Sequence, residues 1–239
     1  MTDHTTVDTP TGGRSRTLGL VTIGQAPRVD LVPELLRWLP GVEVVERGAL
    51  DGLGAEQIAE LAPSSSDRPV LTTRLADGSS VVLDHDKVVT RLQEAVRAVE
   101  GLGVDATLVV CTGEFPALDH TRPLLLAQRL LNAGVRGLCD HDGVLGVVCP
   151  LPDQREMTAV RWSRVARSVE VAVASPYRDD AVEAVAAAAR GLAARGARWI
   201  VLDCMGYTEA MRVAARQVCE VPVLLARSVV GRLAGEVVA

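Results

Sequence analysis

This sequence has few aromatic residues, with three Trp, two Tyr and one Phe among 239 residues. Its core must therefore be aliphatic, and the apolar share of 48% can supply such a core and excludes a disordered chain. No run approaches the roughly 18 uninterrupted apolar residues of a membrane helix, so no membrane partner is expected. Because few rings are available to stack on a large planar ligand, a small polar ligand is favoured.

The sequence also lacks an excess of basic charge, since 25 Lys and Arg residues stand against 30 Asp and Glu residues. Nucleic-acid-binding proteins usually carry a basic excess or patch, so no nucleic-acid partner is expected. The first 13 residues lack the basic-then-apolar pattern of a signal peptide, which favours a cytoplasmic protein. Residues 1–16 leave almost nothing to bury and are expected to form a disordered tail.

Paired cysteines are absent as well. The five cysteines are odd in number, widely spaced and never arranged as C-x-x-C: Cys111, Cys139, Cys149, Cys204 and Cys219. Free thiols in a reducing compartment are therefore expected rather than disulfides or a structural zinc site. Nucleotide-binding glycine motifs are also missing from the sequence. We expect neither a metal nor a cofactor.

Short, continuous apolar runs alternate with helical patterns along the rest of the chain, which is typical of βαβ units with parallel sheets covered on both faces. The expected strands are Leu18–Ile23, Val42–Val45, Thr107–Cys111, Val144–Cys149, Val169–Ala174, Trp199–Asp203 and Val221–Leu225. The expected helices are Arg28–Leu39, Ala55–Leu61, Asp86–Gly101, Leu118–Ala133, Glu156–Arg167, Arg178–Arg195, Glu209–Val218 and Ser228–Val237.

One segment breaks this alternation. Arg68–Arg74 and Ser79–Asp84 are β-rich stretches on either side of Ala76-Asp77-Gly78, and Asp-Gly is a strong hairpin signal. We therefore predict an antiparallel β-hairpin inserted into the first half of the chain.

The two halves of the chain resemble each other. Each half has an early strand and a later strand that ends in a cysteine followed by a small-residue turn. A duplicated unit explains this pattern economically, and a chance resemblance between two α/β halves is the alternative. The first α/β lobe is expected at residues 17–141, enlarged by the hairpin, and the second at residues 142–226. The last helix, residues 227–239, is expected to pack back on the first lobe. The predicted fold is α/β, with two pseudo-symmetric parallel-sheet lobes around one cleft.

The strongest functional signal is the pair of motifs Val109–Gly113 (V-V-C-T-G) and Leu202–Tyr207 (L-D-C-M-G-Y). Each places a cysteine, Cys111 or Cys204, at the carboxyl end of a buried strand, which is where ligands bind in open α/β sheets. Backbone N–H groups at the start of the next helix favour anions and thiolates. If the lobes face each other, the two sulfurs flank one cleft.

Two thiols across a cleft suit one chemistry in particular. A thiolate removes a proton from a carbon next to a carbonyl, and the opposite thiol returns a proton to the other face. The competing interpretation is structural, because buried cysteine is common as a small apolar residue. The matching positions of Cys111 and Cys204 favour the functional interpretation for this pair, while Cys139, Cys149 and Cys219 are interpreted as structural.

These motifs and the duplicated layout resemble the aspartate/glutamate/hydantoin racemase superfamily. Within that superfamily, the chain from about Thr17 onwards resembles AroM-type proteins. The likeness rests on four stretches: L-x-x-x-T-I-G-Q-A-P-R at Leu18–Arg28, D-H-D-K at Asp84–Lys87, Gly196–Tyr207 and V-P-V-L-L at Val221–Leu225. The resemblance implies a racemase-like fold and no cofactor, and it implies that Cys111 and Cys204 are the catalytic acid/base pair.

The resemblance also implies a set of substrate-binding residues. Backbone or hydroxyl donors would come from the two cysteine turns, and the first loop would help to hold the substrate. The position of Arg28 directly after a strand end makes it a candidate for binding a carboxylate through two nitrogens, and a solvated helix residue is the equal alternative. Tyr207 is a candidate donor through its hydroxyl, with a partly buried structural role as the equal alternative. The full set of candidates is Gly24, Gln25, Arg28, Thr112, Gly113, Met205, Gly206 and Tyr207.

The sequence departs from the amino-acid racemases at two points. Their second motif often reads Cys-Thr-His, whereas this chain has Cys204-Met205-Gly206, and their acidic or serine-rich first loop is missing. Both departures fit a small carboxylate or carbonyl substrate that lacks a free ammonium group. Cis–trans isomerisation through one nucleophilic cysteine, decarboxylation, and ligand binding without turnover stay open as alternatives. A homodimer is the default assembly for such enzymes.

Overall fold

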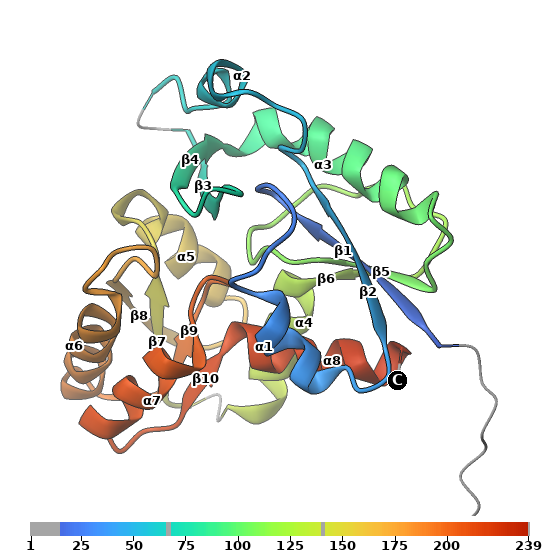
Figure 1. The fold of residues 1–239 in the computed structure, drawn as a ribbon. Helices are drawn as coiled ribbons and strands as arrows, with labels where there is room; N and C mark the ends of the chain where they lie inside the picture. The colour runs from blue at the N-terminus through green and yellow to red at the C-terminus, as the bar shows by residue number, and fades with distance from the viewer. Residues whose placement is uncertain (1–14, 66–67, 140–141, 239) are drawn as a thin grey trace, which may run out of the picture.

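The computed structural model describes residues 15–65, 68–139 and 142–238 of the chain (Figure 1). Its framework is two four-stranded parallel sheets. The first has the order β2 (Glu43–Gly48), β1 (Thr17–Thr22), β5 (Ala106–Val109) and β6 (Leu124–Leu126). The second has the order β8 (Ser168–Val173), β7 (Val144–Cys149), β9 (Ala197–Leu202) and β10 (Val223–Leu225). The predicted two-lobed α/β fold is confirmed, whereas the predicted tail falls almost entirely outside the described residues.

The two sheets correspond strand by strand. In each lobe, the first strand pairs with the second on one side and with the third on the other, and the fourth lies beyond the third. Backbone hydrogen bonds repeat the correspondence: Val110 N donates to Val21 O at 2.9 Å, and Asp203 N donates to Val148 O at 3.0 Å. Residues that follow β5 and β9 therefore occupy equivalent places in the two lobes.

Helices cover both faces of each sheet, as the continuous apolar strands require. They are α1 (Val32–Leu35), α2 (Ala55–Glu60), α3 (His85–Glu100), α4 (Ala127–Leu138), α5 (Arg155–Trp162), α6 (Ala181–Ala194), α7 (Glu209–Val218) and α8 (Ala226–Val238). α3 packs on β1, β2 and β5, and α6 packs on β7, β8 and β9. α1, α4 and α8 lie close together on the other side of the first sheet from α3 (Figure 1). Buried aliphatic residues from both lobes join there in one continuous core.

The predicted helix Leu118–Ala133 is wrong over its first half. Leu124–Leu126 form β6 beside β5, and α4 begins only at Ala127. A leucine run suits a buried strand as well as a helix, so periodicity does not separate the two. Its counterpart in the second lobe is β10, and each strand follows a proline whose carbonyl accepts a hydrogen bond at 2.9 Å, from Thr107 N in the first lobe and Ile200 N in the second.

The predicted helix Arg28–Leu39 begins later than expected. Residues 28–31 form a turn in which Leu31 N and Val32 N both donate to Arg28 O at 3.0 Å, and the helix starts at Val32. Pro33 lies in the first turn of α1, where a backbone N–H is not needed. The first loop is therefore longer than the sequence pattern indicates, and Arg28 belongs to it.

The predicted hairpin is confirmed as β3 (Val70–Arg74) and β4 (Ser80–Asp84), which pair in antiparallel fashion. Gly78 adopts the left-handed conformation in its turn, with a φ of 84°. Asp84 ends the hairpin and caps α3 by accepting a hydrogen bond from Asp86 N at 3.0 Å. Gln154 of the second lobe donates to Val70 O at 3.0 Å, so the hairpin lies against the second lobe near α5 (Figure 1).

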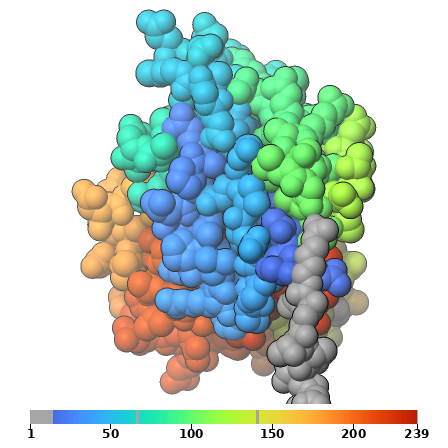
Figure 2. All heavy atoms as spheres, turned by 45° about the vertical axis from the view of Figure 1, so that its right-hand side comes forward, coloured from blue at the N-terminus to red at the C-terminus, as the bar shows by residue number. Residues whose placement is uncertain are grey.

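The space-filling view shows the first-lobe face with α2 projecting at its top and the second lobe below (Figure 2). Within residues 15–65, 68–139 and 142–238, no helix combines the length and apolar character needed to span a membrane.

The contact between α4 and α8 depends on a small residue. A Cβ atom at Gly134 of α4 would lie 2.7 Å from Val229 Cγ1 of α8, which is closer than van der Waals contact allows. Gly137, one turn further along the same helix, has no atom near the equivalent position. The two glycines therefore offer a matched test of this contact.

We predict that Gly134→Ala lowers the free energy of unfolding by about 1–3 kcal/mol, because overpacking pushes α4 away from α8. Gly137→Ala is expected to raise it by about 0.5 kcal/mol, because alanine is the better helix former. Urea unfolding of both variants measures the difference. Equal stability of the two variants would contradict the proposed close approach of the helices.

Candidate active site

A cavity of about 800 Å³ lies between the two lobes, beyond the carboxyl ends of the strands. Six of the predicted site residues line it: Arg28, Cys111, Thr112, Gly113, Cys204 and Met205. The other four, Gly24, Gln25, Gly206 and Tyr207, lie outside its wall. Hairpin residues and α5 complete the wall, so elements from both lobes enclose the space around the two thiols.

The two cysteines have equivalent surroundings. Cys111 comes two residues after the end of β5, and Cys204 comes two residues after the end of β9. Gly113 N donates to Cys111 Sγ at 3.4 Å, and Gly206 N donates to Cys204 Sγ at 3.3 Å. These N–H groups, which we expected to reach a substrate, here point at the sulfurs, where they stabilise a thiolate.

Burial raises the pKa of the Cys111 thiol to about 12, although Gly113 N–H and the charge of Arg161 act in the opposite direction. Burial also raises the pKa of Cys204, against the hydrogen bonds from Gly206 N–H and Tyr177. A negative charge on Cys204 raises the pKa of Cys111 further. The pair therefore favours at most one thiolate at a time, and both thiols keep their protons near neutral pH when no ligand is bound.

A buried ion pair joins the two cysteine motifs. Arg161, in the last turn of α5, donates from one nitrogen to the carbonyl of Thr112 and from another to the carboxylate of Asp203. Trp162 Nε1 donates to the same carboxylate oxygen at 2.8 Å. The Thr112 hydroxyl donates to the backbone carbonyl of Asp203 at 3.2 Å. One side chain of α5 thus holds the residue after Cys111 and the residue before Cys204.

Asp203 is 3% exposed, and its second carboxylate oxygen has no hydrogen-bond partner among the described residues. Complete burial raises the pKa of Asp203, while Arg161 and Trp162 favour its charged form. Its negative charge raises the pKa of both Cys111 and Cys204. The ion pair therefore affects the thiols electrostatically as well as holding their loops.

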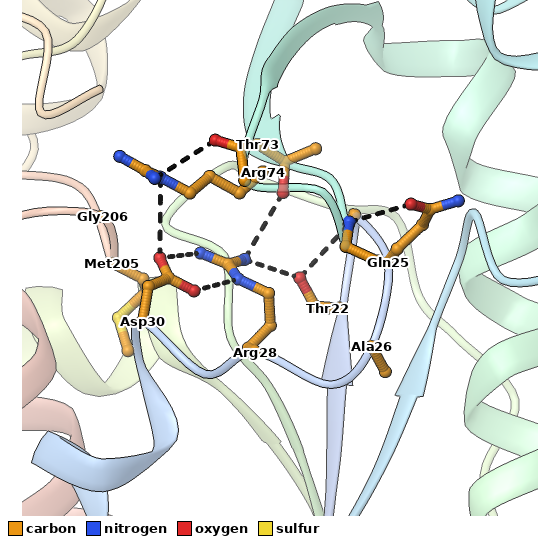
Figure 3. Close-up of polar contacts among 12 residues, drawn as sticks. Thr22, Gln25, Ala26, Arg28, Asp30, Thr73, Arg74, Met205 and Gly206 are labelled. Atoms are coloured by element: carbon orange, nitrogen blue, oxygen red, sulfur yellow. Dashed lines mark hydrogen bonds and ion pairs between the residues drawn. The ribbon is translucent and has the colours of Figure 1, made fainter. Parts of the chain in front are cut away.

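The Arg28 guanidinium is not free to bind a substrate carboxylate in this structure. Its guanidinium binds Asp30 through two nitrogens, at 2.8 and 2.9 Å, and donates to the Thr22 hydroxyl at 2.9 Å (Figure 3). Burial alone would lower the pKa of Arg28, but Asp30 raises it above its usual value. A substrate carboxylate would have to compete with Asp30 for this guanidinium, although the positive charge still reaches Cys204.

Three of the predicted site residues outside the cavity wall make contacts that hold neighbouring loops and strands in place. Gln25 Oε1 accepts from Ala76 N at 2.9 Å, which fastens the hairpin turn to the first loop. A Cβ atom at Gly24 would lie 2.3 Å from Arg74 O, so only glycine fits under β3. The buried Tyr207 hydroxyl donates to Ala174 O at 2.7 Å.

Three residues of the site have no sequence signal that points to it: Tyr177 and Arg161, which line the cavity, and Asp30, which binds Arg28. Tyr177, in the loop between β8 and α6, places its hydroxyl 3.9 Å from Cys204 Sγ. Arg161 reads as an ordinary polar residue on a helix, and Asp30 reads as part of a helix start. Position after a strand end is the one cue that could have marked Tyr177, since it follows β8 by four residues.

Comparison with known proteins supports this architecture. The AroM protein family matches residues 18–238 of this chain. Among curated proteins, none matches.

Solved structures with a similar fold include Picrophilus torridus aspartate racemase, with a TM-score of 0.57, 12% identity and coverage of 90% of this chain and 91% of that chain. A liganded arylmalonate decarboxylase carrying glycine-to-cysteine and cysteine-to-serine substitutions has a TM-score of 0.63, 16% identity and coverage of 93% and 92%. Francisella tularensis glutamate racemase in complex with D-glutamate has a TM-score of 0.58, 11% identity and coverage of 93% and 80%. At these identities the likeness establishes the fold alone.

We predict that Asp203→Asn lowers the free energy of unfolding by about 3–5 kcal/mol, because Arg161 is left as an uncompensated buried charge. Loss of the negative charge should also lower the pKa of Cys111, so that iodoacetamide alkylates it faster than in the unaltered protein. Chemical unfolding and peptide mass spectrometry measure the two effects.

Glu170→Gln is the matched control, since it breaks the exposed ion pair between Glu170 and Arg195, in which the atoms are 3.0 Å apart. Its cost should stay below about 1 kcal/mol. A similar cost for both variants would contradict the structural role given to Asp203.

Proposed function

This chain belongs to the AroM family, and we propose that it is a cofactor-independent racemase or isomerase that acts on a small molecule. The reacting carbon lies next to a carboxylate or carbonyl, and Cys111 and Cys204 exchange its proton. The observation that carries the proposal is the equivalence of the two thiols. Each follows the third strand of its lobe, accepts a glycine N–H and lines the same cavity.

The proposed reaction needs one thiolate and one thiol. The thiolate takes the proton of the substrate carbon, and the electron pair of the broken C–H bond moves into the adjacent carbonyl or carboxylate. The opposite thiol then gives its proton to the other face of the carbon and becomes the thiolate. One turnover thus inverts the carbon and exchanges the roles of the two sulfurs. Charge repulsion between the sulfurs favours the state that this reaction needs, with one thiolate and one thiol.

The charges near the thiols favour a substrate without an ammonium group. Asp203, whose charge reaches both thiols, is bound to Arg161, and Asp30 is bound to Arg28. Each carboxylate is already paired with an arginine, so neither offers an uncompensated negative charge to an ammonium group. The glycine at position 206 adds no polar side chain, in keeping with the same substrate class.

A second candidate function is decarboxylation, which one thiol can support by giving its proton to the carbanion left after CO₂ departs. The raised pKa of both thiols favours this candidate, because a protonated thiol is already the acid that the step requires. Arylmalonate decarboxylase is among the structures with this fold. Nucleophilic addition by one cysteine, giving cis–trans isomerisation, is a further alternative, and ligand binding without turnover is the alternative outside enzymes.

We predict that Cys111→Ser and Cys204→Ser each abolish deuterium incorporation from heavy water into a substrate carbon. Proton NMR on a panel of carboxylates, hydantoins and amino acids measures the exchange. Cys139→Ser is the control, since Cys139 follows α4 and lies outside the cavity wall, so exchange should be retained.

Other outcomes separate the alternatives. CO₂ release that survives loss of one of the two cysteines indicates a decarboxylase, and a covalent adduct on one cysteine indicates the nucleophilic reaction. If compounds of the panel bind but none exchanges a proton, the proposed catalytic reaction is rejected and ligand binding without turnover is supported.

The pH dependence gives a separate prediction. With a pKa of about 12, the thiolate fraction of Cys111 at pH 7 is on the order of 10⁻⁵ and rises tenfold for each pH unit. A racemase that uses Cys111 as base should therefore show kcat/KM rising steadily with pH above 7. A decarboxylase that uses a thiol only as acid should be nearly flat between pH 6 and pH 8. A rate that falls as the pH rises over this range would contradict both.

A further inference from the structure

Tyr177 fills the space that a side chain at position 206 would need. A Cβ atom built at Gly206 would lie 2.6 Å from the Tyr177 hydroxyl oxygen and 2.8 Å from its Cζ. Gly206 does not adopt the left-handed conformation, so the constraint on this residue is steric. Because Gly206 has no side chain, the Tyr177 hydroxyl from another loop can lie next to the Cys204 motif.

Contacts from both lobes hold the ring of Tyr177 in place. The guanidinium carbon of Arg74, on the hairpin of the first lobe, lies 5.2 Å from the ring centroid. Tyr177 N donates to the Ser175 hydroxyl at 3.3 Å within its own loop. Burial raises the pKa of Tyr177 well above its usual value, so the hydroxyl keeps its proton near neutral pH and can donate it in a hydrogen bond.

Among the described residues of the first lobe, no hydroxyl forms a hydrogen bond with Cys111, whose sulfur accepts one from Gly113 N. At Gly113, the equivalent of Gly206, a Cβ atom would instead meet Leu71 Cδ2 of the hairpin, at 2.7 Å. Leu71 lies between β2 and α3, and Tyr177 lies in the corresponding segment between β8 and α6. The two thiols thus share a backbone donor, but only the second has a hydroxyl beside it, among the described residues.

We propose that Tyr177 is a third catalytic group, which donates a hydrogen bond from its hydroxyl to Cys204 Sγ and so makes Cys204 the thiol of the pair that ionises first, while Cys111 keeps its proton. The role rests on the proposed function, in which one thiol of the pair must first be ionised. The charge of Arg28 acts in the same direction on Cys204. The methyl groups of Leu71 offer Cys111 no comparable donor.

Alkylation by iodoacetamide tests the proposal without any substrate. Peptide mass spectrometry gives the rate at Cys204 and at Cys111 separately, over a range of pH. In Tyr177→Phe, the pH at which Cys204 reacts at a fixed rate should rise by about one unit, since a hydrogen bond to a charged group is lost. The profile of Cys111 should stay within about 0.3 unit of its original position. An unchanged Cys204 profile, or an equal shift at both thiols, would overturn the proposal.

Tyr207→Phe is the matched control, because it removes the other tyrosine hydroxyl, which donates to Ala174 O at 2.7 Å. It should lower the melting temperature and leave the Cys204 profile in place. A Cys204 shift as large as that of Tyr177→Phe would show that loss of any nearby hydroxyl has this effect, and would overturn the specific role of Tyr177.

A rescue variant covers the case in which Tyr177→Phe disturbs the fold. Gly206→Ser alone should lower the melting temperature, because its Cβ collides with Tyr177. Combined with Tyr177→Ala, the same serine has room and returns a hydroxyl beside Cys204, so the double variant should regain at least half of the shift caused by Tyr177→Ala. No recovery would count against the proposal. Exchange activity that depends on both cysteines but not on Tyr177 would overturn this inference and leave the proposed function standing.

Discussion

The ion pair between Arg161 and Asp203 is the constraint on which the cleft depends. Taking both charges out of water costs several kcal/mol per ion, and the cost is recovered only when the groups meet in good geometry with further hydrogen bonds. Trp162 Nε1 and the Thr112 carbonyl supply those further bonds. Thr112 follows Cys111, Asp203 precedes Cys204, and Arg161 binds both. If the two cysteine loops moved apart, Arg161 would lose one of these partners while it stayed buried. The sulfurs are therefore held in a fixed relation by α5.

Other buried arginines extend this arrangement around the cavity. Arg227, from α8, donates through two nitrogens to the carbonyl of Met205 and through a third to the carbonyl of Asp30. Arg28 binds the Asp30 side chain. A chain of arginine contacts thus runs from the second cysteine motif to the first loop. Such a site is preorganised, since its donors are already placed before a ligand arrives.

The sequence predicted what local patterns determine. Continuous apolar runs marked the strands, Asp77-Gly78 marked the hairpin, and the two cysteine motifs marked the same edge of each sheet. It did not predict β6, because a leucine run fits a strand and a helix alike. Side-chain partners were also missed. The sequence does not show that Asp30 binds the Arg28 guanidinium, and no residue near Tyr177 indicates that its hydroxyl lies beside Cys204. Side-chain pairing is set by tertiary geometry, which composition and spacing do not contain.

The hairpin explains how two lobes with equivalent strand orders can hold two unlike thiols. Backbone geometry repeats faithfully between the lobes, down to the glycine N–H that each sulfur accepts. Symmetry ends at the segment after the second strand of each lobe, where the first lobe has the hairpin with Leu71 and the second has a short loop with Tyr177. A methyl group does not stabilise a negative sulfur, whereas a hydroxyl does. The insertion therefore differentiates the proposed pair chemically while the strands that carry both cysteines stay equivalent.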